Sequence, residues 1–161
     1  MAHVDCFLKI DGIEGESKDT KHKGSIEISG WSWGAAQTGT SSSGGGAGAG
    51  KVAMQDAHFS MSVSKASPKL MLACATGDHI KQAVLTCRKA GKDQQEYLKY
   101  TFSDVLISSF QTGGNAGGVT PTETVALNFS KIEVEYKEQQ HDGTLGGRIK
   151  TGWDVKASKA I

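Results

Sequence analysis

Apolar and polar residues alternate along most of this 161-residue chain. Alternation with a period of two is the mark of a β-strand with one buried face. No helical pattern of 10–15 residues separates successive segments, as a parallel sheet would require. The pattern therefore predicts a mainly β domain with six to eight antiparallel strands, arranged as a barrel or sandwich. The predicted strands cover residues 3–10, 25–34, 52–63, 80–89, 97–110, 122–136 and 151–156.

The period slips by one residue within the segment 25–34. Two isoleucines before Gly30 share one phase, whereas Trp31 and Trp33 after it fall in the other. A β-bulge at Gly30 would return all four side chains to one face. On this interpretation Trp31 and Trp33 pack in the core, and Ser32 between them faces the opposite side.

A second slip separates Phe129 from Ile132 and predicts another bulge. Two bulges in long strands favour a curved sheet that closes on itself. On the apolar face of the segment 52–63, Phe59 is expected in the core, as is Phe129 on its own strand.

One short helix is predicted between the third and fourth strands. Ser67 has the chemistry of an N-cap, Pro68 suits the first helical position, and Gly77 ends the run. So short a helix is marginal alone, so we expect it to dock on the sheet. The side chains predicted on its docking face are Leu70, Met71 and Cys74.

Residues 37–50 contain no side chain larger than the opening Gln37. Such a segment buries too little apolar area to offset its ordering entropy, so we predict a long mobile loop or one ordered by a partner. Long loops inside one domain are usually functional. Its candidate contact residues are Gln37, Thr38, Thr40, Ser41, Ser42, Ser43, Gly44, Gly45, Gly46, Gly48 and Gly50.

The charge balance excludes several classes of partner. Lys and Arg number 18 against 17 Asp and Glu, which gives a formal charge of +1 and no field to attract nucleic acid.

The sequence contains no segment that predicts membrane insertion. The longest apolar run, 70–75, is far too short for a membrane helix. The N-terminus lacks the pattern of a cleaved secretory signal, and three cysteines at irregular spacing indicate reduced thiols in a cytoplasm.

No motif in the chain predicts catalysis, a metal or a cofactor. Residues 45–52 approach the phosphate-binding GxxxxGK[ST] motif, but Val52 replaces its hydroxyl residue and no helix follows. The five histidines have no metal-ligand spacing. Two alternatives stay open: a monomeric carbohydrate-binding β-domain that uses Trp31 and Trp33, and a hydrolase built from scattered Ser, His and Asp residues.

Seven short strings occur in a specific order over residues 2–156. They are Glu14–Asp19, Trp31–Gly34, the Gly44–Gly50 tract with Lys51 and Val52, Ser67–Cys74, Arg88–Gly91, Glu96–Leu98 and Val125–Phe129. As an ordered set they resemble the haemolysin-coregulated protein (Hcp) family, the inner-tube subunit of the bacterial type VI secretion system.

This resemblance implies one tube domain over residues 1–161: a β-barrel of two sheets with one flanking helix, assembled as a homo-hexameric ring. Rings would stack into a hollow tube inside a contractile sheath, behind a spike protein, with effector proteins in the lumen. The protein would be cytoplasmic before firing and then be secreted without a signal peptide. Ser32 becomes a candidate for the lumen, and the loop 37–50 a candidate for contacts between subunits or rings. No enzyme activity, cofactor, nucleic acid or membrane insertion is expected.

Overall fold

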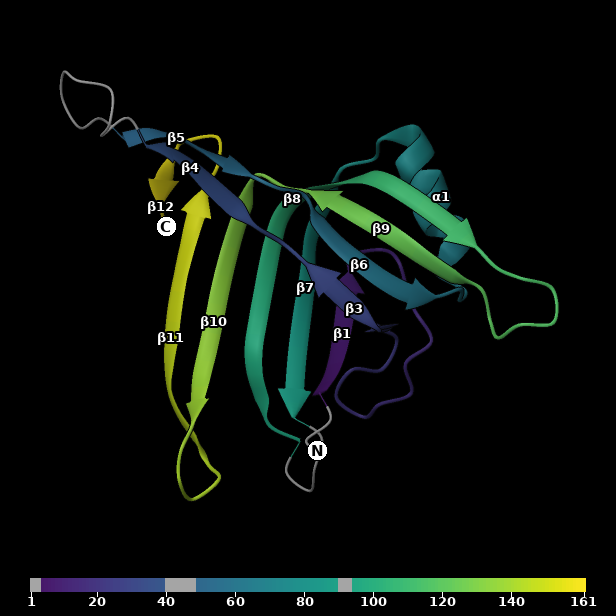
Figure 1. Ribbon diagram of the computed structural model, residues 1–161, viewed down its shortest axis with the longest axis horizontal. Coiled ribbons are helices and arrows are strands. Elements are labelled where there is room, and N and C mark those ends of the chain that lie inside the picture. The colour runs from purple at the N-terminus through teal and green to yellow at the C-terminus, as the bar shows by residue number, and fades with distance from the viewer. Residues whose placement is uncertain (1–3, 40–48, 90–93) are drawn as a thin grey trace.

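The computed structural model describes residues 4–39, 49–89 and 94–161 (Figure 1). In these residues one helix, α1 (Ser67–Thr76), accompanies twelve strands. The strands are β1 (Val4–Ile10), β2 (Ile26–Ile28), β3 (Gly30–Ser32), β4 (Ala35–Gly39), β5 (Ala49–Met54), β6 (Ala57–Ser62), β7 (Ile80–Lys89), β8 (Glu96–Gly113), β9 (Thr122–Asn128), β10 (Lys131–Gln139), β11 (Leu145–Asp154) and β12 (Lys159–Ala160).

The strands form two layers that share β8. The first layer has the order β12-β11-β10-β8-β7-β1-β2, and the second has the order β3-β6-β9-β8. The first half of β8 pairs with β7 and β10, and its second half pairs with β9. Figure 1 shows β6 and β9 running obliquely across the strands of the first layer. The predicted mainly β, antiparallel fold with one short helix is confirmed.

The sheets do not close into a complete barrel. Within the described residues, β12 and β2 end the first layer and neither pairs with the other. The chain instead turns a corner at Ser29, whose N–H and hydroxyl both donate to the carbonyl of Ser60, at 2.8 and 3.0 Å. The expectation that the sheet closes into a barrel was therefore wrong. Among the described residues β2 pairs only with β1, and at Ser29 the chain passes from the first layer to the second, so the ladder of the first layer ends at β2.

The two predicted bulges are changes of sheet. Strand β2 pairs with β1, whereas β3 pairs with β6, so the slip at Gly30 marks a crossing between layers. In the same way β9 pairs with β6, and β10 follows with β8 and β11 as its partners. A bulge and a sheet change both shift the period by one residue, so the sequence pattern could not separate them.

The predicted strand 52–63 is likewise broken into β5 and β6. The break at Asp56 is held by its carboxylate, which accepts hydrogen bonds from the Ser108 hydroxyl at 2.7 Å and the Asn128 amide at 2.9 Å. These bonds tie the start of β6 to β8 and to the end of β9.

The bend of β8 between its two layers lies at Asp104. This residue has a left-handed backbone, with φ of 53°, which is uncommon for residues other than glycine. Its carboxylate accepts a hydrogen bond from buried Ser130 at 2.7 Å and lies 3.0 Å from the ring of His79. The bond from Ser130, followed by the contact with His79, lowers the pKa of Asp104. This network offsets the cost of the bend, so one strand serves both layers.

Helix α1 occupies the predicted residues with one difference at its start. Ala66 is the N-cap, and the Ser67 hydroxyl donates instead to the carboxylate of buried Glu123 on β9. Gly77 ends the helix with φ of 69°. Leu70 and Ala73 are the buried residues of the helix, Cys74 is half-buried, and Met71 is 53% exposed, against its expected place in the docking face.

The core lies between the two layers. Phe59 on β6 and Phe102 on β8 meet edge to face with ring centroids 6.1 Å apart, and Phe129 lies 5.1 Å from Phe102. These rings and Leu70 are buried. Aromatic pairs with this geometry stabilise a core by about 0.5–1.5 kcal/mol beyond their area.

A buried ion pair fastens the segment 11–25 to the outer side of β1 and β7. Arg88 on β7 is 3% exposed and donates two hydrogen bonds to Asp19, at 2.9 and 2.6 Å. Its guanidinium also lies 4.8 Å from the ring of Phe7, which stacks on His22. The bonds from Arg88 lower the pKa of Asp19 to about 2. Together these contacts hold the segment against the sheet.

We predict that this ion pair makes stability depend on pH in the acid range. The folded pKa of Asp19 is about 2, below the usual value of about 3.9 for an unfolded chain. The stabilisation is therefore complete above about pH 4 and disappears as the pH falls through about 2. Asp19→Asn should lower the melting temperature at pH 7, and its difference from the wild type should shrink toward pH 2.

Thermal unfolding followed by circular dichroism between pH 2 and pH 7 measures this difference. Asp11→Asn, which changes an exposed carboxylate on the preceding turn, is the matched control and should follow the wild type. An Asp19→Asn difference of the same size at pH 2 and pH 7 would contradict the assignment.

Candidate assembly surface

Ser32 lies on an exposed face of the second layer. Its strand β3 pairs with β6, and Ser32 is directly opposite His58 there. Trp31 and Trp33 point to the other side, where they are half-buried against the core. Their ring centroids lie 5.2 and 6.1 Å from that of Tyr100. Tyr100 thus packs against both indoles, which does not favour the open sugar platform considered from the sequence.

Strands β4 and β5 form a separate two-stranded hairpin. In Figure 1 it extends beyond the upper edge of the main sheets. The register joins Ala35 to Met54 and Gln37 to Val52, then shifts before Gly39 pairs with Ala49. Within the part of the chain that the structure describes, neither strand has a second partner. Each therefore carries a free edge of N–H and C=O groups, which is a template for pairing with another chain.

The predicted loop 37–50 is therefore longer than the segment that lies between β4 and β5. Gln37 and Thr38 belong to β4, and Gly50 belongs to β5. Small residues bury little apolar area, but a ladder of backbone hydrogen bonds needs no large side chain. The remaining candidates, Thr40, Ser41, Ser42, Ser43, Gly44, Gly45, Gly46 and Gly48, lie outside the described residues.

An apolar groove of about 360 Å³ lies where the hairpin meets the first layer. One wall comes from Trp33 and the hairpin, and the other from β10 and β11. The lining residues are Trp33, Gln37, Val52, Met54, Ile132, Val134, Thr151, Gly152 and Trp153. An open groove of this composition suits a segment of protein better than a charged small molecule.

The apolar face of the first layer continues past the groove. Leu98 on β8 is directly opposite Tyr136 on β10, which is directly opposite Ile149 on β11. Tyr136 is 43% exposed and Ile149 is 69% exposed. The rows that hold Phe102 and Ile132 are buried under the second layer, whereas this outer row is not. The single chain therefore leaves part of a hydrophobic face open to solvent.

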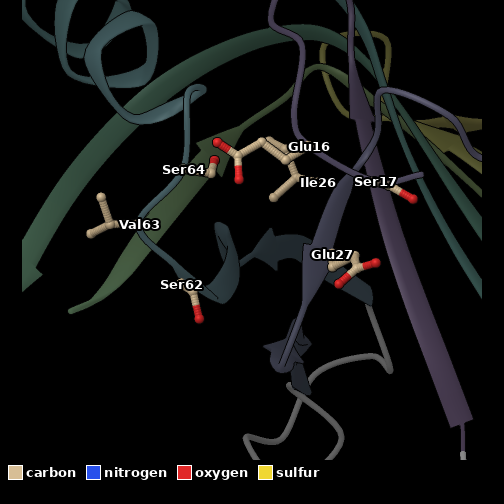
Figure 2. Close-up of a pocket in the computed structure, with 7 residues that line it drawn as sticks. All are labelled: Glu16, Ser17, Ile26, Glu27, Ser62, Val63 and Ser64. Atoms are coloured by element: carbon tan, nitrogen blue, oxygen red, sulfur yellow. The ribbon is translucent and has the colours of Figure 1, made fainter. Parts of the chain in front are cut away.

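A smaller and more polar pocket lies between β2 and the segment after β6. Figure 2 shows its lining, with the carboxylate of Glu16 turned toward Ser64 and that of Glu27 turned away. Glu16 already accepts a hydrogen bond from the backbone N–H of Lys65 at 2.9 Å. No histidine is among the residues that line the pocket and its two carboxylates point apart, so the lining contains neither a Ser–His pair nor two facing carboxylates.

Across residues 4–39, 49–89 and 94–161, no three His, Cys, Asp or Glu side chains gather where a metal ion could be held. No helix among these residues is long and apolar enough to cross a membrane.

Comparison with known proteins identifies the family of this chain. The family model for "Type VI secretion system effector, Hcp" matches residues 7–136, which span β1 to the middle of β10. The chain belongs to the Hcp family. Protein hcp1 of Pseudomonas aeruginosa is 48% identical over 155 residues, which cover 95% of this chain and 96% of that protein.

Solved Hcp structures have the same arrangement of strands. Hcp1 from Salmonella typhimurium is 44% identical and covers 100% of both chains with a TM-score of 0.84. A structure described as a type six secretion system protein is 33% identical and reaches a TM-score of 0.94 over 99% of this chain and 100% of its own. The likeness thus extends over both layers and the helix of this Hcp chain.

Sequence reasoning did not identify the apolar groove of this Hcp chain. Its walls come from β5, β10 and β11, and the sequence contained a signal in the alternation of Val52 with Met54 and of Ile132 with Val134. Such alternation indicates a face that is buried, but does not say whether the same chain buries it. The pairing of the hairpin leaves Val52, Met54 and Val134 half-exposed, whereas Ile132 is buried.

Two tryptophans that line the groove each have a buried indole N–H without a partner in the described ranges. In the described part of the chain, the indole Nε1–H groups of Trp33 and Trp153 are buried, and neither has an acceptor within hydrogen-bond distance. A buried donor without an acceptor costs about 1–3 kcal/mol. The two indole N–H groups therefore contribute to the packing of Trp33 and Trp153 without a compensating hydrogen bond among the described residues.

We predict that Trp153→Phe changes the stability of the folded chain by no more than about 1 kcal/mol, because it removes an unpaired donor together with some packing volume. Urea unfolding of the variant and the wild type measures the change. Trp33→Phe should behave alike. A loss above about 2 kcal/mol in the variant would contradict this prediction.

Proposed function

We propose that this protein is the inner-tube subunit of a type VI secretion apparatus. Six copies form a ring, and the rings stack into a hollow tube inside a contractile sheath and behind a spike protein. The chain resides in the cytoplasm before firing and leaves through the apparatus without a cleaved signal peptide, with effector proteins in the lumen. The observation that carries this proposal is the whole-chain match to Hcp proteins, at 44% identity over 100% of a solved one.

The surface features of the single chain support self-association. The groove beside Trp33 and Trp153 is apolar, and the outer row ending at Ile149 is exposed. Exposed apolar area of this kind usually marks a protein interface. A neighbouring copy that covered this apolar area would remove it from water.

The hairpin β4–β5 supports contacts beyond one subunit. It extends from the edge of the sheets, and its free backbone edges allow β-sheet pairing with another copy (Figure 1). We propose that this arm, with the loop residues between its strands, lies across the next subunit or the next ring. The small residues of the segment 37–50 permit close backbone approach there.

We also propose that Ser32 faces the lumen. Its side chain is exposed on the face opposite Trp31 and Trp33, so it is directed away from the core of its own chain. A small hydroxyl at this position would leave the bore wide and polar. The carbohydrate-binding alternative is not favoured, because Tyr100 packs against the two indoles that would have to bind the sugar. No observation on the described residues favours the hydrolase alternative.

Light scattering coupled to size exclusion tests the assembly. We expect a particle of six times the 17.0 kDa of one chain, and longer stacks at high concentration. A particle of 17.0 kDa at all concentrations would overturn the proposed function. Deleting Ser41–Gly46 separates ring formation from stacking, because six-fold particles should persist while stacks become fewer. Stacking equal to that of the wild type would refute the role of the arm.

Replacing Ser32 by glutamine tests its place in the bore. Ser32→Gln adds bulk to an exposed position, so the rings should form as before while retention of a small effector protein changes. Co-purification of the effector with the ring measures retention. Ala75→Gln, on the exposed side of α1, is the matched control and should retain the effector as the wild type does. Loss of the rings in Ser32→Gln would place Ser32 in a subunit contact instead.

A further inference from the structure

Two cysteine thiols face each other across the strand pair β1–β7. Cys6 on β1 and Cys87 on β7 are directly opposite in the antiparallel register, and their Sγ atoms are 2.6 Å apart. Both cysteines are free thiols in this structure. Directly opposite residues of an antiparallel pair have Cα atoms about 4.5–5.5 Å apart, which falls within the span that a disulfide bridges. Bond formation therefore needs little movement of the backbone.

We propose that Cys6 and Cys87 form a redox site that closes to an intramolecular disulfide when the folded protein meets a small disulfide oxidant such as oxidised glutathione. The third cysteine, Cys74, lies on α1 and takes no part. The site depends on the register of two strands whose cysteines are 81 positions apart, so no spacing motif in the sequence reveals it.

The surroundings give the two thiols different roles. Cys6 is half-buried and lines an open cavity of about 390 Å³, whereas Cys87 is 1% exposed. The hydrogen bond from Cys87 lowers the pKa of Cys6, and the same contact together with burial raises the pKa of Cys87. Cys6 is therefore the more accessible thiol and the one that reacts first, through its thiolate form, and Cys87 is the resolving thiol.

The reaction is a double thiol–disulfide exchange. The Cys6 thiolate attacks one sulfur of the oxidant, whose disulfide bond breaks and releases one small thiol. Cys87 then gives up its proton and attacks Sγ of Cys6 in the mixed disulfide, and the second small thiol leaves. Two protein thiols are thereby oxidised, and the two electrons and two protons reduce the small disulfide to two thiols.

Closure would fasten β1 to β7 covalently. The bond would close a long loop, and long loops gain most from a cross-link because the unfolded chain loses more freedom. The use of this site rests on the proposed function, in which the protein moves from the cytoplasm to another compartment. A tube subunit would keep the thiols reduced in its own cytoplasm and close the bond after delivery to an oxidising compartment.

The test starts from the purified full chain, incubated in the folded state with dithiothreitol or with oxidised glutathione. Alkylation under denaturing conditions and mass spectrometry then count the free thiols. We expect three labels on the reduced protein and one, on Cys74, on the oxidised protein. Peptide mapping should join the segments of Cys6 and Cys87. The oxidised protein should melt roughly 5–15 °C higher.

Variants separate this pair from other thiol chemistry. Cys74→Ser should oxidise as the wild type does, whereas Cys6→Ser should keep two alkylatable thiols and show no gain in melting temperature. Persistence of three labels on the oxidised wild type, a stable glutathione adduct, or a bond between two chains would each overturn the proposal. The wild-type comparison decides the matter even if Cys6→Ser fails to fold. Ring mass, measured in both redox states, reports on the proposed function separately.

Discussion

The fold depends on one strand that belongs to two sheets. Strand β8 pairs with β7 and β10 in its first half and with β9 in its second, and it bends at Asp104. A left-handed backbone is unfavourable for aspartate, but the hydrogen bond from Ser130 to its carboxylate holds the bend. Because both layers are anchored to this strand, the core rings Phe59 and Phe102 meet between them.

The same arrangement leaves part of the apolar surface of the first layer exposed to solvent. The second layer covers the rows that contain Phe102 and Ile132, but the first layer extends further, to Tyr136 and Ile149. The hairpin β4–β5 adds an apolar groove beside Trp33 and Trp153. Among the described residues each of its strands also has one edge that pairs with no other strand. A chain that exposes such features as a monomer is suited to burying them against another protein chain.

Ion pairing and thiol chemistry act on the opposite flank of the first layer, at β1 and β7. Arg88 holds the segment 11–25 through its hydrogen bonds to Asp19. The residue before Arg88 on β7 is Cys87, whose thiol contacts that of Cys6. Successive residues of a strand face opposite sides, so the ion pair lies on the outer face and the thiols lie on the inner one. Strand β1 is thereby held from both sides.

The sequence alone determined the class of fold, the helix 67–76 and most strand positions, because alternation and the Pro and Gly signals are local. Its motifs also identified the family. Tertiary structure decided whether a phase slip such as that at Gly30 was a bulge or a change of sheet, since both shift the period equally. It also decided that Gln37 pairs with Val52 in a hairpin and that Cys6 meets Cys87. Each depends on the register between segments distant in sequence, which no local pattern contains.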